Sequence, residues 1–175
     1  NSIAFCEGFY YKPRIDYNTL EKYSEGLICL SACIAGDIPQ YLLKGMDDEA
    51  YKLGLRLKNM FADGDFYIEV QDHSLKEEKF ILPKLYDLAK KLGVKTVATN
   101  DVHYIDKEDA EMQDILMCVQ MQKSVNDPNR LKFDTDEFYF KTYEQMKELF
   151  DEDSLATTLE IADKCNYKFE YGHYM

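Results

Sequence analysis

The chain has 175 residues and a formal net charge of −12, with 46% hydrophobic and 31% charged residues. This length is enough for one domain, and no stretch approaches the ~18 apolar residues of a membrane helix. The negative charge repels phosphate backbones, so we expect the chain by itself to bind DNA weakly. Five cysteines without CxxC spacing, and no signal-peptide pattern, indicate reduced thiols and a cytoplasmic location.

The first half of the chain alternates between strand and helix patterns. The apolar run "GLICL" predicts a buried strand over 27–30. Two helices follow, a short one in "GDIPQYLLKG" and a longer one in "MDDEAYKLGLRLKNMF", whose apolar residues recur at helical spacing. Asp47 is the expected N-cap of the longer helix.

The next elements form a strand–helix–strand unit. The segment "DFYIEV" predicts a strand because its side chains alternate between two faces. A long helix is expected from the capping-box pair Ser74 and Glu77 to about Leu92, with a bend or a later start caused by Pro83. The segment "VKTVAT" predicts another buried strand. This order indicates a βαβ unit, in which the two strands are parallel.

The second half of the chain is predicted to be mostly helical. Asp106 is the expected cap of a helix in "KEDAEMQDILMCVQM", whose residues Met112, Met117 and Met121 are expected to pack inward. The segment "LKFDTDEFYFKT" fits a strand or an extended arm, and "YEQMKELF" and "SLATTLEIADKC" predict two short helices. The whole pattern favours one α/β domain over 1–175 with a helical tail.

Polar side chains gather where the three predicted strands end. They are Cys33 after the first strand, Glu69, Asp72 and His73 after the second, and Asp101 and His103 after the third. Because the loops after parallel strands meet on one face, we expect these side chains to converge. Thiolate, carboxylate and imidazole groups bind Zn²⁺, and carboxylates also bind Mn²⁺ or Mg²⁺.

Each candidate ligand also has a structural interpretation. Cys33 alone is more often a small buried hydrophobe. Asp72 and His73 suit a turn that enters a helix, and Asp101 suits a turn as well. The chain has only three histidines, which argues against a complete multinuclear metal site built from this chain.

The stretch "YYKPR" places two cations beside two tyrosines. Lys12 and Arg14 are candidate phosphate contacts, although a surface loop before a helix explains the same pattern. No P-loop, GxGxxG or GxSxG motif is found, so nucleotide cradling and serine-esterase chemistry lack support.

Six segments resemble the polymerase-and-histidinol-phosphatase (PHP) domain of the bacterial C-family replicative DNA polymerases: "EGFYYKPRID", "EKYSEGLICLSACIAGDIPQ", "FYIEVQDH", "VATNDVHY", "DAEMQDILMCVQ" and "RLKFDTDEFYFKT". They occur in the order of that family and the resemblance covers essentially the whole chain. It implies a distorted, TIM-like, seven-stranded α/β barrel with mostly parallel strands. About 1–140 would be the barrel part, and about 141–175 a helical segment that leads toward the polymerase palm.

The resemblance also implies a divalent-metal site, with zinc, manganese or magnesium, in which Cys33, Asp101 and His103 are ligands. A second set from a segment typical of the family is Glu69, Asp72 and His73. Where such a site is intact, the family resembles a metal phosphoesterase and acts as a 3′–5′ exonuclease. Where it has decayed, the domain is structural and docks a proofreading subunit. The polymerase reaction itself uses Mg²⁺.

The chain departs from the family at its front, where the H-x-H strand of PHP domains is missing. We therefore expect a part of a larger polymerase, inactive by itself, that begins about halfway into the domain. The whole polymerase would act on a DNA primer-template and deoxynucleotides, and would bind a proofreading exonuclease subunit and a sliding clamp. The alternative is a stand-alone phosphoesterase of the histidinol-phosphatase type.

Overall fold

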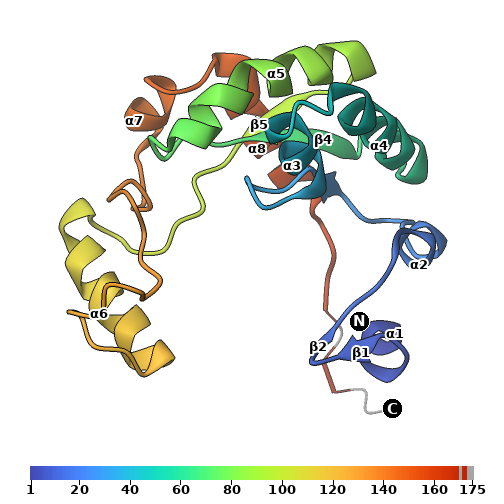
Figure 1. The fold of residues 1–175 in the computed structure, drawn as a ribbon. Helices are drawn as coiled ribbons and strands as arrows, with labels where there is room; N and C mark the ends of the chain where they lie inside the picture. Colours follow the sequence, from blue (N-terminus) through green and yellow to red (C-terminus); the bar gives the residue numbers. More distant parts are fainter. Residues whose placement is uncertain (170, 173–175) are drawn as a thin grey trace.

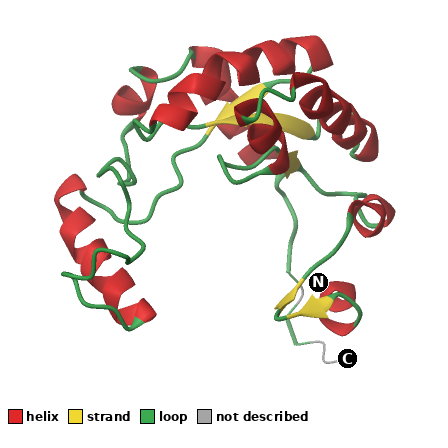
Figure 2. Cartoon of the chain, viewed as in Figure 1, coloured by secondary structure: helices red, strands yellow, loops and turns green. Residues whose placement is uncertain are grey.

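The computed structural model describes residues 1–169, 171 and 172, so the end of the predicted 141–175 segment lies partly outside it. Its centre is a parallel sheet with the strand order β3-β4-β5, formed by Cys29–Leu30, Phe66–Val70 and Thr96–Ala98 (Figure 2). The predicted α/β class and the parallel pairing are confirmed. The described residues contribute these three parallel strands, and a seven-stranded barrel is not formed by them alone.

The helix α5, Lys76–Leu92, covers one face of the sheet and packs on β4. Its buried stripe recurs at helical spacing: Ile81, Leu85, Leu88 and Leu92. The helix runs through Pro83 without a later start and ends at Gly93, whose φ of 64° is the left-handed conformation that glycine adopts without strain. Ser74 does not cap it, because the helix begins two residues later.

Two more helices complete this layer, α3 at Asp37–Leu43 and α4 at Asp47–Met60. Asp47 is the first helical residue of α4 rather than its N-cap. The close approach of α4 to α5 depends on Gly54, because a Cβ atom there would lie 2.6 Å from Leu92 Cδ1. Ile38, Leu42, Ala50 and Leu57 join the same apolar core.

The predicted helical tail follows as α7, Tyr143–Lys147, and α8, Glu152–Lys164, which packs along β5. Asp151 caps α8 by accepting a hydrogen bond from the Ser154 amide at 2.8 Å. At the other end of α8, the Lys164 ammonium donates to the Tyr67 hydroxyl at 2.7 Å. The Lys164–Tyr67 hydrogen bond attaches the end of the tail to β4.

Two arms extend from this body, and Figure 1 shows them at opposite ends of an arch. One arm holds α1, β1, β2 and α2, at Ser2–Cys6, Phe9–Tyr10, Lys12–Pro13 and Tyr17–Lys22. The other holds the 3-10 turn η1, Lys107–Asp109, and α6, Ala110–Met121. Asp106 forms the capping box of η1, as its position predicted.

The α6 arm exposes a stripe of apolar side chains at helical spacing, which consists of Met112, Ile115, Leu116 and Val119. Met112 is 62% exposed, so the expectation that it packs inward was wrong. The following segment, 131–141, is an extended arm whose only pairing among the described residues is an isolated bridge from Tyr139 to Tyr104. None of the described helices is both long and apolar enough to cross a membrane.

Candidate metal centre at the carboxyl edge of the sheet

The three parallel strands end at the same edge of the sheet, so the loops that follow them are neighbours there. Each of these loops contains a residue other than glycine in the left-handed backbone region. Ala32 has a φ of 68° just before Cys33, Ser74 has a φ of 63°, and Asp101 has a φ of 41°. Such strained residues persist only where the surrounding structure holds them, and they concentrate at functional sites.

Glu69 is held in place at the end of β4 by its neighbours on both adjacent strands. Its backbone amide donates to Ser31 Oγ at 2.9 Å. Its carboxylate oxygen Oε1 accepts from Thr99 Oγ1 at 2.5 Å and from Gln71 Nε2 at 3.1 Å. The half-buried Glu69 therefore links the ends of all three strands, through its backbone amide on the β3 side and its carboxylate on the β5 side.

Cys33 lies at the same edge of the sheet. The residue is a free, half-buried cysteine, and it lines a small hollow together with Glu69 and Gln71. Residues from the first and second predicted strand ends thus line one hollow.

Asp101 and His103 form a second pair at the end of β5. His103 Nε2 lies 3.5 Å from Asp101 Oδ2, and both side chains are partly exposed. The His103 ring packs at a tilt against Phe133, with 4.8 Å between ring centroids, and its amide donates to the Phe138 carbonyl at 2.8 Å. The imidazole and the carboxylate remain available to a ligand on their solvent side.

The two pairs do not merge into one cluster. Across the part of the chain that the structure describes, no three His, Cys, Asp or Glu side chains are grouped closely enough to hold a metal ion. The reason is topological, because β4 lies between β3 and β5, which separates the outer strands by about 10 Å. The donor chemistry of Cys33, Asp101 and His103 fits a divalent metal, while a complete ligand set requires additional groups.

Asp72 and His73 occupy the turn between β4 and α5. Asp72 Oδ1 accepts from the Ser74 amide at 2.8 Å, and Ser74 takes a left-handed φ of 63°. This is the helix-entry turn that Asp favours. The Asp72 carboxylate is thereby occupied in part by the local backbone.

His73 is only 1% exposed, and both of its ring nitrogens have partners. Nδ1 lies 2.8 Å from Glu78 Oε1, and Nε2 lies 2.9 Å from the Asn100 carbonyl oxygen. Burial opposes the charged form of the ring, yet these two acceptors raise the pKa of His73 overall. Likewise, burial of the Glu78 carboxyl is outweighed by its hydrogen bonds to His73, which lower its pKa.

Glu78 is a member of this edge that sequence reasoning missed. A signal existed, because Glu78 stands on the same helical stripe as Ile81 and Leu85, which face the core. A carboxylate on the buried face of an amphipathic helix requires a partner. His73, five residues earlier, is that partner.

Lys12 and Arg14 lie on the arm of β1 and β2, apart from the three-stranded sheet (Figure 1). The Arg14 guanidinium stands 5.7 Å from the centroid of the Tyr10 ring, a cation–π geometry. The structure therefore does not bring these two candidate phosphate contacts to the strand ends.

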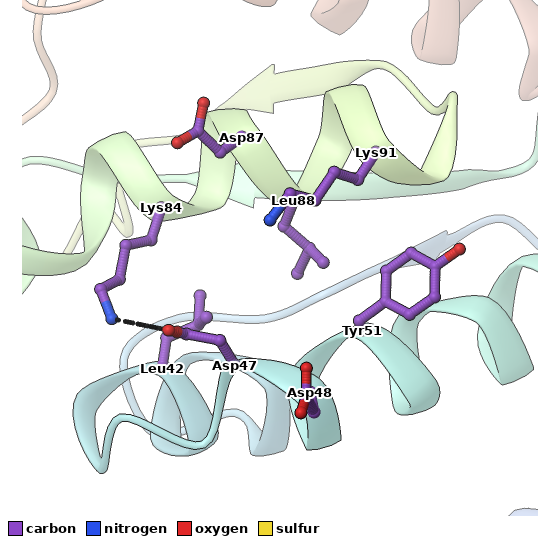
Figure 3. Close-up of a pocket in the computed structure, with 8 residues that line it drawn as sticks. All are labelled: Leu42, Asp47, Asp48, Tyr51, Lys84, Asp87, Leu88 and Lys91. Atoms are coloured by element: carbon purple, nitrogen blue, oxygen red, sulfur yellow. Dashed lines mark hydrogen bonds and ion pairs between the residues drawn. The ribbon is translucent and has the colours of Figure 1, made fainter.

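A hollow of about 620 Å³ is a groove between α4 and α5, and none of the residues that line it belongs to the strand-end loops. Figure 3 shows Lys84 reaching across it to Asp47, and the Nζ–Oδ1 distance is 3.0 Å. Its lining mixes carboxylates and ammonium groups, which are Asp47, Asp48, Asp87, Lys84 and Lys91. This is ordinary helix–helix surface, and it lacks the convergent polar groups of a binding site.

Comparison with known proteins finds similarity to a domain family over the first 73 residues and to a group of polymerase subunits over nearly the whole chain. Residues 1–73 match the model of the PHP domain. A DNA polymerase III subunit alpha of Treponema pallidum is 48% identical over 170 residues, covering 96% of this chain and 14% of that protein. The same subunit of Borreliella burgdorferi is 46% identical over 167 residues, covering 94% of this chain and 14% of that protein. The subunit of Thermus aquaticus is 40% identical over 179 residues, covering 99% of this chain and 15% of that protein.

The chain is homologous to one segment of the DNA polymerase III alpha subunits. The resemblance of its motifs to the PHP domain of replicative polymerases is thereby confirmed. The chain spans about one seventh of the length of these relatives, since it covers 14% of the first two. Most of the length of these relatives therefore has no counterpart in this chain.

Proposed function

We propose that this chain is part of the PHP domain of a bacterial replicative DNA polymerase, and that its strand-end loops supply part of a divalent-metal site. The observation that carries the proposal is the placement of Cys33 and Glu69 around one hollow, together with the pairing of Asp101 with His103, along one sheet edge. The match to polymerase III alpha subunits over 96% of the chain supports the polymerase context.

The three parallel strands would then be one section of a seven-stranded PHP barrel, with about 1–140 in the barrel and about 141–175 leading toward the palm. Strands from the rest of the polymerase would complete the sheet. They would also bring the additional ligands that this chain lacks. Lys12 and Arg14 remain candidate phosphate contacts on a separate arm.

The proposed ligands are Cys33, Asp101 and His103, with Glu69 beside Cys33, while the partners of Asp72 and His73 favour structural roles for them. A thiolate and an imidazole favour zinc, and the carboxylates also accept manganese or magnesium. When bound, such an ion would neutralise a phosphate group of a nucleic acid strand and activate water, which is phosphoesterase or 3′–5′ exonuclease chemistry. The role of Cys33, Asp101 and His103 in this chain would be to hold and orient the metal ion.

The polymerase reaction belongs to other parts of the proposed subunit, which would use Mg²⁺, the primer-template and deoxynucleotides. The proofreading exonuclease subunit and the sliding clamp would likewise be partners of the whole enzyme. A stand-alone phosphatase is the weaker alternative, because the relatives named above are polymerase subunits.

The test is metal content in the full-length polymerase that contains this segment. Asp101→Asn suits it, because Asn also tolerates the left-handed backbone and removes only the charge. After dialysis against buffered Zn²⁺ or Mn²⁺, elemental analysis should find less metal in Asp101→Asn and in Cys33→Ser than in the parent. Glu77→Gln, an exposed change on α5, is the control. Unchanged metal in both ligand variants would reject the proposed site.

A second arm of the test concerns activity. The 175-residue chain alone should not extend a primer on a DNA template. Nucleotide incorporation by the purified chain would contradict the assignment of synthesis to other parts of the subunit.

A further inference from the structure

The loop that carries Asp101 and His103 is held by side-chain contacts as well as by a few backbone hydrogen bonds. β5 ends at Ala98, and the Thr99 amide then donates to the Val70 carbonyl at 3.1 Å. Asn100, immediately before Asp101, is held by two further hydrogen bonds. Its carbonyl oxygen is 2.9 Å from His73 Nε2, and its side-chain amide donates to the Tyr139 carbonyl.

The His73 ring is itself fixed on both sides. Glu78 accepts from it twice, through Oε1 to the ring Nδ1 at 2.8 Å and through Oε2 to the backbone amide at 2.6 Å. The flat face of the ring stacks on Phe138, with 4.1 Å between centroids. His73 and Glu78 are 1% and 4% exposed, so neither exchanges these partners for water.

The same network reaches the extended arm. Lys141 Nζ donates to Asn100 Oδ1 at 3.2 Å and lies 3.1 Å from Glu137 Oε2. The His103 amide donates to the Phe138 carbonyl. Asn100 and His103 flank Asp101. Asn100 is held by His73 and Lys141, and His103 is held by the backbone of Phe138 on the arm.

We propose that His73 and Glu78 are a positioning pair that orients the Asp101–His103 turn for a divalent metal ion. The proposal rests on the proposed function, and it assigns His73 to the support of the ligands. Both ring nitrogens already face oxygen acceptors, so the ring presents no free lone pair to a metal. Groups that support metal ligands in this way change metal affinity about 10–100-fold when they are removed.

The decisive variant is Glu78→Gln in the full-length polymerase, with the exposed neighbour Glu77→Gln as its control. Dialysis against a series of buffered Mn²⁺ or Zn²⁺ concentrations, followed by elemental analysis, gives the apparent Kd. We expect Glu78→Gln to weaken binding at least about 10-fold and Glu77→Gln to leave it unchanged. Phe138→Leu, which keeps most of the apolar volume, is a milder second variant and should weaken binding in the same direction.

A loss of stability alone must be separated from a loss of orientation. Leu155→Ala removes core volume in α8, away from the network, and should lower the urea midpoint while keeping the parent Kd. A Kd for Leu155→Ala that shifts as far as that of Glu78→Gln would overturn the positioning role. So would parent affinity in both Glu78→Gln and Phe138→Leu.

Asp101→Asn separates this inference from the proposed function. If Asp101→Asn binds metal like the parent, the metal site itself is rejected. If Asp101→Asn loses metal while Glu78→Gln and Phe138→Leu do not, only the positioning pair is rejected. Weakening in Asp101→Asn, Glu78→Gln and Phe138→Leu, with Leu155→Ala and Glu77→Gln unaffected, supports both.

Discussion

The imidazole of His73 lies nearly parallel to the ring of Phe138, with 4.1 Å between ring centroids and 11° between ring planes. These residues are 65 positions apart, one at the end of β4 and the other on the extended arm. The stacked rings therefore attach the arm to the sheet edge beside the isolated bridge between Tyr104 and Tyr139.

Replacement of Phe138 by alanine should destabilise the chain strongly. Phe138 is 7% exposed, and Phe→Ala in a core costs about 3–5 kcal/mol. Phe140 on the same arm is 67% exposed and is the matched control, with an expected change within about 0.5 kcal/mol. Urea unfolding followed by circular dichroism measures both. Equal midpoints for the two alanine variants would show that the stacking does not contribute.

Gly36 should be intolerant of alanine. A Cβ atom there would lie 2.7 Å from the backbone carbonyl oxygen of Ser31, in the turn that positions Cys33. The backbone cannot move aside cheaply, so we expect Gly36→Ala to cost about 1–3 kcal/mol. Gly54→Ala is the comparison, because its contact is the end of a flexible Leu92 side chain. Chemical denaturation should rank Gly36→Ala as the more damaging change.

The cap of α8 should make stability depend on acid pH. Partial burial opposes ionisation of Asp151, but hydrogen bonds from Tyr86 and Ser154 outweigh it and lower the pKa of Asp151 below its usual 3.8. A lowered folded-state pKa stabilises the fold above the unfolded value, and this stabilisation is lost as the pH falls through the folded value. Asp151→Ala should cost about 1 kcal/mol at pH 7.

The measurement is urea unfolding of Asp151→Ala and of the parent at pH 7 and below pH 3. The difference between them should shrink at the lower pH. Asp153→Ala, an exposed carboxylate in the same first turn, should have a smaller effect at pH 7. A difference for Asp151→Ala that is as large in acid as at pH 7 would contradict the role of its charge.

The 175-residue chain should bind single-stranded DNA weakly. With a net charge of −12, it repels the phosphate backbone. Fluorescence anisotropy with a labelled oligonucleotide at physiological salt should show no saturation in the micromolar range. Tight, salt-sensitive binding that is lost in the double variant Lys12→Ala, Arg14→Ala would instead identify the β1–β2 arm as a phosphate contact.

The central elements could be predicted from the sequence because hydrophobic periodicity reports local structure. The alternation in β4 and the stripe of α5 each reflect side chains that the fold buries. The buried strand expected over 27–30 was wrong in extent and burial, because β3 spans only Cys29–Leu30, both residues are half-buried, and Leu27 is 48% exposed. Helix starts were less accurate. Asp47 and Ser74 both look like caps, but one is already helical and the other sits in a left-handed turn.

The candidate site could be predicted only in part. The parallel βαβ pattern places the polar strand ends on one edge, and Cys33 lines the same hollow as Glu69, while metal binding by these residues stays a prediction. Local sequence patterns do not determine the order of strands in a sheet. The position of β4 between β3 and β5, which separates Cys33 from Asp101, could therefore not be predicted. The pairing of His73 with Glu78 was missed for a similar reason, since a buried ion pair leaves only one misplaced charge in an apolar stripe.

The apolar stripe of α6 has a practical consequence for anyone who purifies the chain. Met112, Ile115, Leu116 and Val119 face water together, and such stripes attract one another between molecules. Light scattering should rise steeply as the sample is concentrated. In the Leu116→Lys variant the rise should begin at a higher protein concentration. Crystallisation and NMR samples would therefore benefit from this surface change before any other.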